Sequence, residues 1–206
     1  MRGLFITFEG CEGCGKSTQV KLLKEALEGL GKSCLTTREP GGPPVAEAIR
    51  TILLDPAYPE MLPETELLLY NASRSQHTGQ WIIPALMRGE IVLCDRYFDS
   101  TIAYQGAARS LDQKFIELLT AFATYSTTPD ITFLIDLPVE EGLARISDRN
   151  LDRLEKEHLS FHQKVREQYL KLAREHNSRY TVINGSLEPQ AIHAEILAIV
   201  LSRTGA

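Results

Sequence analysis

Apolar residues are distributed along this chain in two repeating patterns. Short runs of consecutive apolar residues alternate with longer segments in which apolar residues recur every three or four positions. Short runs are typical of strands buried on both faces of a sheet, and periodic segments are typical of amphipathic helices. Five runs predict strands, at residues 4–8, 34–37, 91–94, 131–136 and 180–184. Because helical segments separate the strands, we predict a three-layer α/β fold with a five-stranded parallel sheet flanked by helices.

Two of the predicted helices carry specific expectations. The helix over 111–125 has apolar side chains at helical spacing that we expect to face the core, namely Phe115, Leu118, Leu119 and Phe122. The helix that begins after Pro138 carries arginines at four-residue intervals, namely Arg145, Arg149 and Arg153. Stacked like charges cost helix stability unless an anion lies nearby. We therefore predict a mobile basic flap over bound phosphates, although the pairing of Glu141 with Arg145 is an ordinary alternative.

Length and composition narrow the class of protein. The 206 residues, 43% hydrophobic and 24% charged, predict a single globular domain over 1–206. The net charge of -5 argues against a nucleic-acid polymer as partner, because such proteins neutralise many phosphates. No stretch approaches the ~20 apolar residues of a membrane span, and the N-terminus lacks a signal pattern. We expect a cytoplasmic protein without a membrane partner.

Four cysteines allow two interpretations. Cys34 and Cys94 lie in apolar, strand-like runs, where a free cysteine behaves as a small hydrophobe. Cys11 and Cys14 form a C-x-x-C pattern, which is compatible with a redox pair or half of a metal site. No second pair completes a zinc set. We favour the interpretation that both are variable residues of a loop.

That loop, Gly10–Ser17, is the most specific motif in the chain. It matches G-x-x-x-x-G-K-[ST] and lies between a predicted strand and a predicted helix, which is the context of a phosphate-binding loop. Lys16 suits the β and γ phosphates of a nucleoside triphosphate, and the Ser17 hydroxyl suits a magnesium ion. A glycine-rich turn without a ligand is the disfavoured alternative. The residues expected to contact the donor nucleotide are Gly10, Cys11, Glu12, Gly13, Cys14, Gly15, Lys16, Ser17 and Thr18.

The third predicted strand ends in Asp95 and Arg96. An aspartate that closes an apolar strand after a phosphate loop is a suitable magnesium partner. Motor and helicase ATPases typically place a glutamate next, which activates water, whereas this chain has an arginine. An arginine binds phosphate, so this neighbour favours transfer to a second phosphate over hydrolysis.

Two further segments suggest an acceptor site. Arg38 to Gly42 follows the second predicted strand at the sheet edge where ligands bind in open α/β folds, although a plain turn is the alternative. Tyr70 and Arg74 lie on one face of a helix that begins near Glu64. An aromatic ring one turn before an arginine can stack on a base while the guanidinium binds its edge. Half-buried packing is the other interpretation of this pair.

The motifs together resemble those of bacterial thymidylate kinases, within the nucleoside monophosphate kinases. The resemblance covers nearly the whole chain and rests on Phe8-Glu9-Gly10, Arg38-Glu39-Pro40-Gly41-Gly42, Asp95-Arg96-Tyr97, Ala103-Tyr104-Gln105-Gly106 and Asp152-Arg153-Leu154-Glu155. It implies a P-loop NTPase fold, transfer of the ATP γ-phosphoryl group to thymidine 5′-monophosphate with Mg²⁺, and a homodimer. It also implies monophosphate-binding helices within about 38–106 and a small LID segment at about 145–157.

The resemblance assigns roles by position. Ser17 and Asp95 would hold magnesium, Arg96 with Arg38 would hold the acceptor phosphate, and Tyr70 and Arg74 would bind thymine. The residues implied for the remaining acceptor contacts are Glu12 and Tyr104 at the deoxyribose, and Pro40, Ser100, Thr101 and Gln105 around it and the base. Lys16 and Arg96 are expected to be catalytic. Because the phosphate loop contains no arginine, Arg149 and Arg153 are the candidates for the cation that neutralises the transferred group.

Two alternatives have features that distinguish them. Another kinase of the same fold would act on a different monophosphate or on a nucleoside. A GTP-dependent switch would carry D-x-x-G and N-K-x-D, neither of which occurs in the chain.

Overall fold

The computed structural model describes residues 2–148 and 150–204. Its five strands are β1 (Phe5–Glu9), β2 (Cys34–Arg38), β3 (Ile91–Asp95), β4 (Ile131–Asp136) and β5 (Tyr180–Asn184). All neighbouring pairs are parallel, in the order β2-β3-β1-β4-β5. The predicted parallel sheet is therefore confirmed, with each strand boundary within one residue of its expected position.

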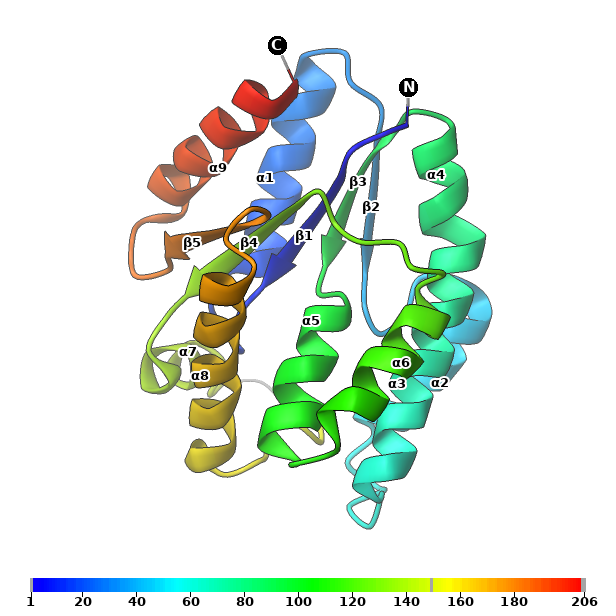
Figure 1. The fold of residues 1–206 in the computed structure, drawn as a ribbon. Helices are drawn as coiled ribbons and strands as arrows, with labels where there is room; N and C mark the ends of the chain where they lie inside the picture. The colour runs from blue at the N-terminus through cyan, green and yellow to red at the C-terminus, as the bar shows by residue number, and fades with distance from the viewer. Residues whose placement is uncertain (1, 149, 205–206) are drawn as a thin grey trace.

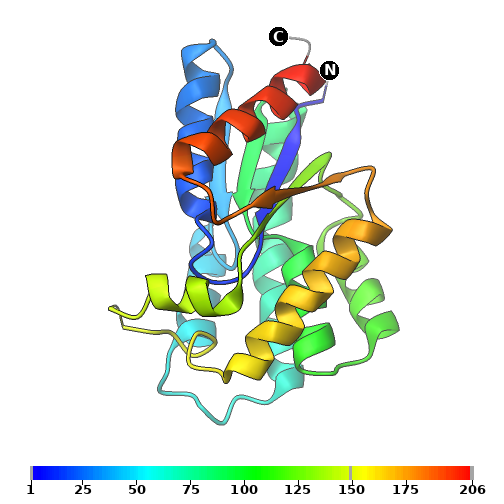
Figure 2. The same ribbon diagram turned by 90° about the vertical axis from the view of Figure 1, so that its left-hand side faces the viewer.

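Helices cover both faces of this sheet (Figure 1). The helices are α1 (Lys16–Gly29), α2 (Pro44–Leu54), α3 (Pro63–His77), α4 (Ile83–Met87), α5 (Phe98–Thr101), α6 (Gln113–Ala123), α7 (Val139–Arg145), α8 (Leu159–Glu175) and α9 (Pro189–Thr204). Two π-helical segments, η1 (Thr78–Ile82) and η2 (Ile102–Ala108), continue α3 and α5. Figure 2 shows α1 and α9 on one side of the sheet and α8 on the other.

The alternation of side chains along β1 explains the three layers. Ile6 and Phe8 are fully buried in a cluster with residues of α1 and α9. Phe5 belongs to a second cluster with residues of η1, α4 and β3. Successive strand residues point to opposite faces, so a strand that is apolar at both faces needs a helical layer on each side.

Helix α6 differs from the expectation in the direction of its apolar face. Only Leu119, of the four residues predicted to face the core, packs against a buried cluster. Phe115, Leu118 and Phe122 are 53%, 73% and 78% exposed. The helix was correctly predicted, but its apolar stripe points largely into solvent.

The predicted length of the helix that carries Arg145, Arg149 and Arg153 is also wrong. Helix α7 ends at Arg145, and Arg149 lies outside the described residues. Further along the segment, Asp152 forms a separate turn, in which its Oδ1 accepts hydrogen bonds from the backbone N–H groups of Leu154 and Glu155, both at 2.9 Å. The three arginines therefore do not form one helical stripe.

Within the described residues, none of the helices has both the length and the apolar character that crossing a bilayer requires.

Candidate active site

The phosphate loop joins the C-terminal end of β1 to the N-terminus of α1. Its glycines Gly10, Gly13 and Gly15 have φ angles of 137°, 70° and 97°, which side chains with a β-carbon rarely adopt. At Gly13 a β-carbon would also collide with the backbone of Gly142. This backbone allows successive N–H groups to converge on one anion at the start of a helix.

Lys16 is buried and lies along the loop. Its Nζ donates hydrogen bonds to the carbonyl oxygens of Gly10, at 3.0 Å, and Cys11, at 2.7 Å. The ammonium group is thus held at the loop, where phosphate groups of a nucleotide would approach.

The two loop cysteines point away from this surface. Cys11 and Cys14 are buried free thiols, and Lys16 Nζ lies 3.4 Å from Cys14 Sγ. Burial, together with the negative charge of Glu12, raises the pKa of Cys11 to about 12. Thiol exchange needs an accessible thiolate, and the described residues contain no group of three or more metal-ligating side chains. The burial of both thiols therefore argues against their acting as a redox pair.

Ser17 and Asp95 meet although 78 residues separate them. The Ser17 hydroxyl donates a 2.5 Å hydrogen bond to Asp95 Oδ2. The contact forms because β1 pairs with β3, so the end of β3 lies beside the start of α1. Two hard oxygen ligands at the mouth of a phosphate loop fit Mg²⁺, which typically takes one or two protein oxygens and completes its shell with water and phosphates.

Arg96 follows β3 and reaches across the loop. Its backbone has a φ of 71°, uncommon for a residue other than glycine. Its guanidinium donates to the Gly10 carbonyl at 3.1 Å and to Glu12 Oε1 at 3.0 Å, and it lies over the Tyr104 ring. The arginine is thereby fixed beside the phosphate loop.

Glu12 is an unusual loop residue because it is a buried carboxylate. Burial alone would raise its pKa, but Arg96, His162, Lys16 and Tyr104 together outweigh burial and lower it, so the group stays ionised. Tyr104 donates to Oε1 at 2.5 Å, and His162 Nδ1 lies 3.3 Å from Oε2. Oε2 has no hydrogen bond of its own. It is buried and faces His162.

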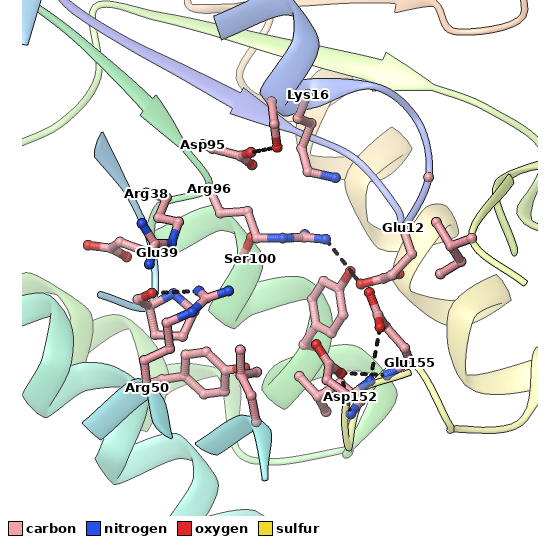
Figure 3. Close-up of a pocket in the computed structure, with 18 of the residues that line it drawn as sticks. Glu12, Lys16, Arg38, Glu39, Arg50, Asp95, Arg96, Ser100, Asp152 and Glu155 are labelled. Carbon is pink, nitrogen blue, oxygen red and sulfur yellow. Dashed lines mark hydrogen bonds and ion pairs between the residues drawn. The ribbon is translucent and has the colours of Figure 1, made fainter. Parts of the chain in front are cut away.

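These groups surround one cavity of about 600 Å³ at the C-terminal ends of the strands, the usual ligand position in open α/β sheets. Figure 3 shows Lys16 and Asp95 at the top of the view, Arg38 close to Asp95, Arg50 at the lower left, and Arg96 between Lys16 and Arg50. The predicted residues that line the cavity are Glu12, Gly13, Gly15, Lys16, Ser17, Thr18, Arg38, Pro40, Tyr70, Arg74, Asp95, Arg96, Ser100, Thr101, Tyr104 and Gln105.

The wall formed by α3 contains a buried arginine. Arg74 is 1% exposed and donates to Glu39 Oε2 at 2.7 Å and to Thr101 Oγ1 at 2.8 Å. Glu39, whose peptide bond to Pro40 is cis, also contacts His77 Nδ1 at 3.0 Å. Tyr70 lines the cavity one turn before Arg74. The two side chains predicted to bind a base are therefore brought together at one wall.

Some predicted residues do not line the cavity. These are Gly10, Cys11 and Cys14, which form the interior of the loop, and Arg153. Arg153 is buried, donates to the Leu53 carbonyl at 3.0 Å and pairs with Glu66 Oε2 at 2.6 Å. Arg153, for which we predicted a catalytic role, is thus held by both contacts and is not among the residues that line the cavity.

Sequence reasoning also missed several residues that line the cavity. These are Glu39, Arg50, Leu54, Ile146, Asn150, Asp152, Leu154 and Glu155, whereas Arg145, which we predicted in the basic flap, also lines the cavity. Arg50 donates to the Pro40 carbonyl at 2.7 Å, and burial with the nearby Arg38 charge lowers its pKa. Arg145 reaches the Gly13 carbonyl at 3.4 Å. No motif marks Arg50, since its position depends on how α2 packs.

One cavity contains a phosphate loop, a carboxylate suited to magnesium and several arginines. This combination defines a P-loop enzyme with a second anion-binding site. The family model described as "Thymidylate kinase" matches residues 8–196, and the chain belongs to this family. As a member of it, the protein is a phosphotransferase.

Curated relatives and a solved structure agree with the family match. The "Thymidylate kinase" of Trichlorobacter lovleyi is 47% identical over 97% of this chain and 98% of its own, and that of Geotalea uraniireducens is 49% identical over 98% of both. The crystal structure of thymidylate kinase from Ehrlichia chaffeensis superposes with a TM-score of 0.81 at 33% identity, covering 97% of this chain and all of that one.

Proposed function

We propose that this protein transfers the γ-phosphoryl group of ATP to thymidine 5′-monophosphate, giving ADP and thymidine 5′-diphosphate, as a step in dTTP synthesis. The observation that carries the proposal is the position of Arg96 beside the phosphate loop, tied to the Gly10 carbonyl at 3.1 Å. A donor on the loop and an acceptor phosphate on Arg96 would meet in one cavity. The family match supports the identity of both substrates.

The donor half of the site is the phosphate loop. Lys16 and the loop amides would bind the β and γ phosphates. Ser17 and Asp95 would hold Mg²⁺, which when bound supplies charge that offsets the negative charge of the phosphates. The support is the 2.5 Å contact between their oxygens, which places both at the same corner of the cavity.

The acceptor half combines a charged region with a base wall. Arg96 and Arg38 would bind the monophosphate, and Arg50 adds a cation that lines the same cavity. Tyr70 would stack on thymine while Arg74 contacts its edge. Glu39, Thr101 and the Tyr97 carbonyl fix the Arg74 guanidinium at this wall.

Glu12 and Tyr104 would recognise the deoxyribose. Glu12 is ionised and lines the cavity, so its carboxylate can accept a hydrogen bond from a sugar hydroxyl. Tyr104, held to Glu12 Oε1 and beneath Arg96, would form the wall next to the 2′ carbon that disfavours a ribonucleotide. Pro40, Ser100, Thr101 and Gln105 would complete the acceptor pocket.

The cation for the transferred group is assigned to the segment at about 145–157, which we propose as the LID of a single domain. Arg149 is the candidate from sequence and lies outside the described residues. Arg145 is a second candidate, because it lines the cavity and contacts the Gly13 carbonyl of the phosphate loop. Arg153 is better explained as a residue that holds this segment to α2 and α3.

We further propose that the protein is a homodimer. The support is the exposed apolar face of α6, formed by Phe115, Leu118 and Phe122, beside α3, which exposes Leu68. Contiguous apolar surface of this kind is typical of permanent interfaces between subunits. The family resemblance makes a second copy of this chain the expected partner. We place the enzyme in the cytoplasm, where four free cysteines are usual.

The proposal is tested by comparing acceptors. Purified protein is assayed with ATP, Mg²⁺ and thymidine, deoxyuridine, uridine or guanosine monophosphate, or with thymidine itself. We expect the highest kcat/KM with thymidine monophosphate. Better turnover of any other acceptor would assign the chain a different substrate within the same fold.

A further inference from the structure

Glu9 is a buried carboxylate that the proposed function leaves without a role. It is the last residue of β1, immediately before the phosphate loop, and is fully buried. Its Oε1 accepts a hydrogen bond from the Tyr97 backbone N–H at 2.7 Å. Its Oε2 accepts from the Ser100 hydroxyl at 2.7 Å and from the Tyr169 hydroxyl at 2.8 Å. A buried carboxylate costs stability unless such donors satisfy it.

The two hydroxyls connect Glu9 with Arg96. Ser100 Oγ and Tyr169 OH are 2.8 Å apart, and both lie within 3.5 Å of Arg96 NH1. Each hydroxyl has one proton to donate. When both protons point to Glu9, the lone pairs of both oxygens are free to accept from the Arg96 guanidinium.

The second contact of Glu9 acts on the backbone next to Arg96. Arg96 holds a φ of 71°, a conformation that costs energy in residues other than glycine and persists only when surrounding contacts fix it. The hydrogen bond from the Tyr97 N–H to Glu9 is one such contact. Glu9 thus restrains both the main chain and the side-chain neighbours of Arg96.

We propose that Glu9 is a positioning residue that orients Arg96 towards the acceptor phosphate through Ser100, Tyr169 and the Tyr97 amide. The proposal rests on the proposed function, since it gives Arg96 the acceptor phosphate as its ligand. Glu9 itself touches no substrate.

Charged groups from several elements face Glu9. Asp99 on α5 lies nearby and is paired with Arg179 at 2.7 Å. The other ionisable groups that face Glu9 are Arg96, Tyr169 on α8, Tyr180 on β5 and Cys94 on β3. Burial first, and then the Asp99 charge, raise the pKa of Glu9 to about 7, because Arg96 and the two hydroxyls offset them only in part. Glu9 therefore changes protonation in the neutral range.

Protonation reverses the hydrogen bonds around Oε2. A protonated Glu9 donates its proton to one hydroxyl and occupies a lone pair that had faced Arg96. Above its pKa, Glu9 is ionised and both hydroxyls can accept from Arg96. As the pH falls through about 7, the part of the restraint that passes through the two hydroxyls weakens, so acceptor binding weakens.

The test is the pH dependence of kcat/KM for thymidine monophosphate in the full-length wild type and Glu9→Gln. The acceptor phosphate titrates near ~6 and gives both enzymes one acid limb. We expect a second limb near 7 in the wild type only. At pH 8, Glu9→Gln should lose kcat/KM on the order of tenfold through a higher acceptor KM, the effect of weakening one charge-assisted hydrogen bond. The KM for ATP should not change.

Two tyrosine variants provide matched comparisons. Tyr169→Phe removes one donor to Glu9, so its upper limb should move to higher pH, since a lost donor destabilises the carboxylate. Tyr97→Phe removes a buried hydroxyl that contacts Thr78 and keeps the backbone N–H, so its limb should stay in place. Thermal melting of each variant confirms that it is folded.

The outcomes separate this role from the function itself. The role of Glu9 is overturned if the wild type is active and its limb near 7 persists in Glu9→Gln. It is also overturned if the pH profile of Tyr169→Phe equals that of Tyr97→Phe. Either result leaves the proposed function intact. A wild type that transfers no phosphate to thymidine monophosphate overturns both.

Discussion

Single charged residues determine what the cavity can do. The roles of Lys16 and Arg96 can be tested directly by substitution. Removing a preorganised cation from a phosphoryl-transfer site typically costs ~10²–10³ in rate. We expect Lys16→Ala and Arg96→Ala each to lower kcat/KM by at least roughly that factor, measured by steady-state assay with thymidine monophosphate.

Arg88→Ala is the matched control for these variants. Arg88 is exposed and paired with Glu90 just before β3 begins, at the opposite end of the sheet from the site. Its removal should leave kcat/KM unchanged. An Arg96→Ala enzyme as active as Arg88→Ala would contradict the assignment of the acceptor phosphate to Arg96.

Cysteine chemistry gives a second prediction at this scale. Burial raises the pKa of Cys11 to about 12, and burial with the Glu28 charge raises that of Cys34 to about 11. At pH 7.5 we expect native protein to react with a thiol reagent far more slowly than protein unfolded in denaturant, in which all four thiols react. Rapid labelling of Cys11 or Cys14 in the native protein, with loss of activity, would restore the redox interpretation. The sequence alone left this open because it does not show burial.

Among the elements, the segment after α7 is held by an ion-pair cluster that no motif predicted. Glu66 on α3 is 1% exposed and pairs with Arg153, at 2.6 Å, and with Arg109, at 3.2 Å. Removing one partner of a buried pair leaves an uncompensated charge and costs ~3–5 kcal/mol. For a chain of this size, Glu66→Ala should lower Tm by roughly 6–20 °C, followed by circular dichroism.

A surface glutamate and the partner arginine provide the comparison. Glu25→Ala breaks only an exposed pair with Lys21 and should leave Tm unchanged. Arg153→Ala should lower Tm as Glu66→Ala does, with a smaller change in kcat than in stability. A native Tm with a large loss of kcat would instead support a catalytic Arg153.

The prediction of a long α7 failed because the spacing of arginines does not show where a helix ends. Arg145 and Arg153 do have helical spacing, but α7 ends at Arg145, and Asp152 forms a turn of its own on the N–H groups of Leu154 and Glu155. Aspartate competes with helical hydrogen bonds in this way. Spacing alone therefore could not decide whether the helix continued.

At the scale of the whole molecule, the exposed face of α6 predicts association. Phe122→Asp places a charge on this apolar face and should convert a dimer into a monomer, measured by light scattering after size exclusion. Met87→Asp is the control, because Met87 is 78% exposed, like Phe122, but lies on α4. A wild type that elutes as a monomer would contradict the dimer.

The sheet was predictable because central parallel strands leave continuous apolar runs, as in β1 and β4, which are buried on both faces. The residues at strand ends were predictable for a related reason, since the topology brings Ser17 and Asp95 to one edge. Periodicity showed that α6 has an apolar face, but it could not show what covers that face.

Residues whose role depends on distant partners could not be predicted. Glu9 meets Tyr169 across 160 positions of sequence, and Glu66 meets Arg153 only after the chain has folded. Arg50 reaches the cavity because α2 packs along α3. No local pattern encodes any of these contacts, so they emerge only with the tertiary structure.

The central claim is that one cavity joins a donor on the phosphate loop to an acceptor phosphate on Arg96. The most direct measurement is to incubate the enzyme with ATP, Mg²⁺ and thymidine monophosphate and to quantify all products by ion-exchange chromatography. We predict ADP and thymidine diphosphate in equal amounts, with no free phosphate. ADP accompanied by inorganic phosphate and unchanged thymidine monophosphate would show hydrolysis, and would contradict the account.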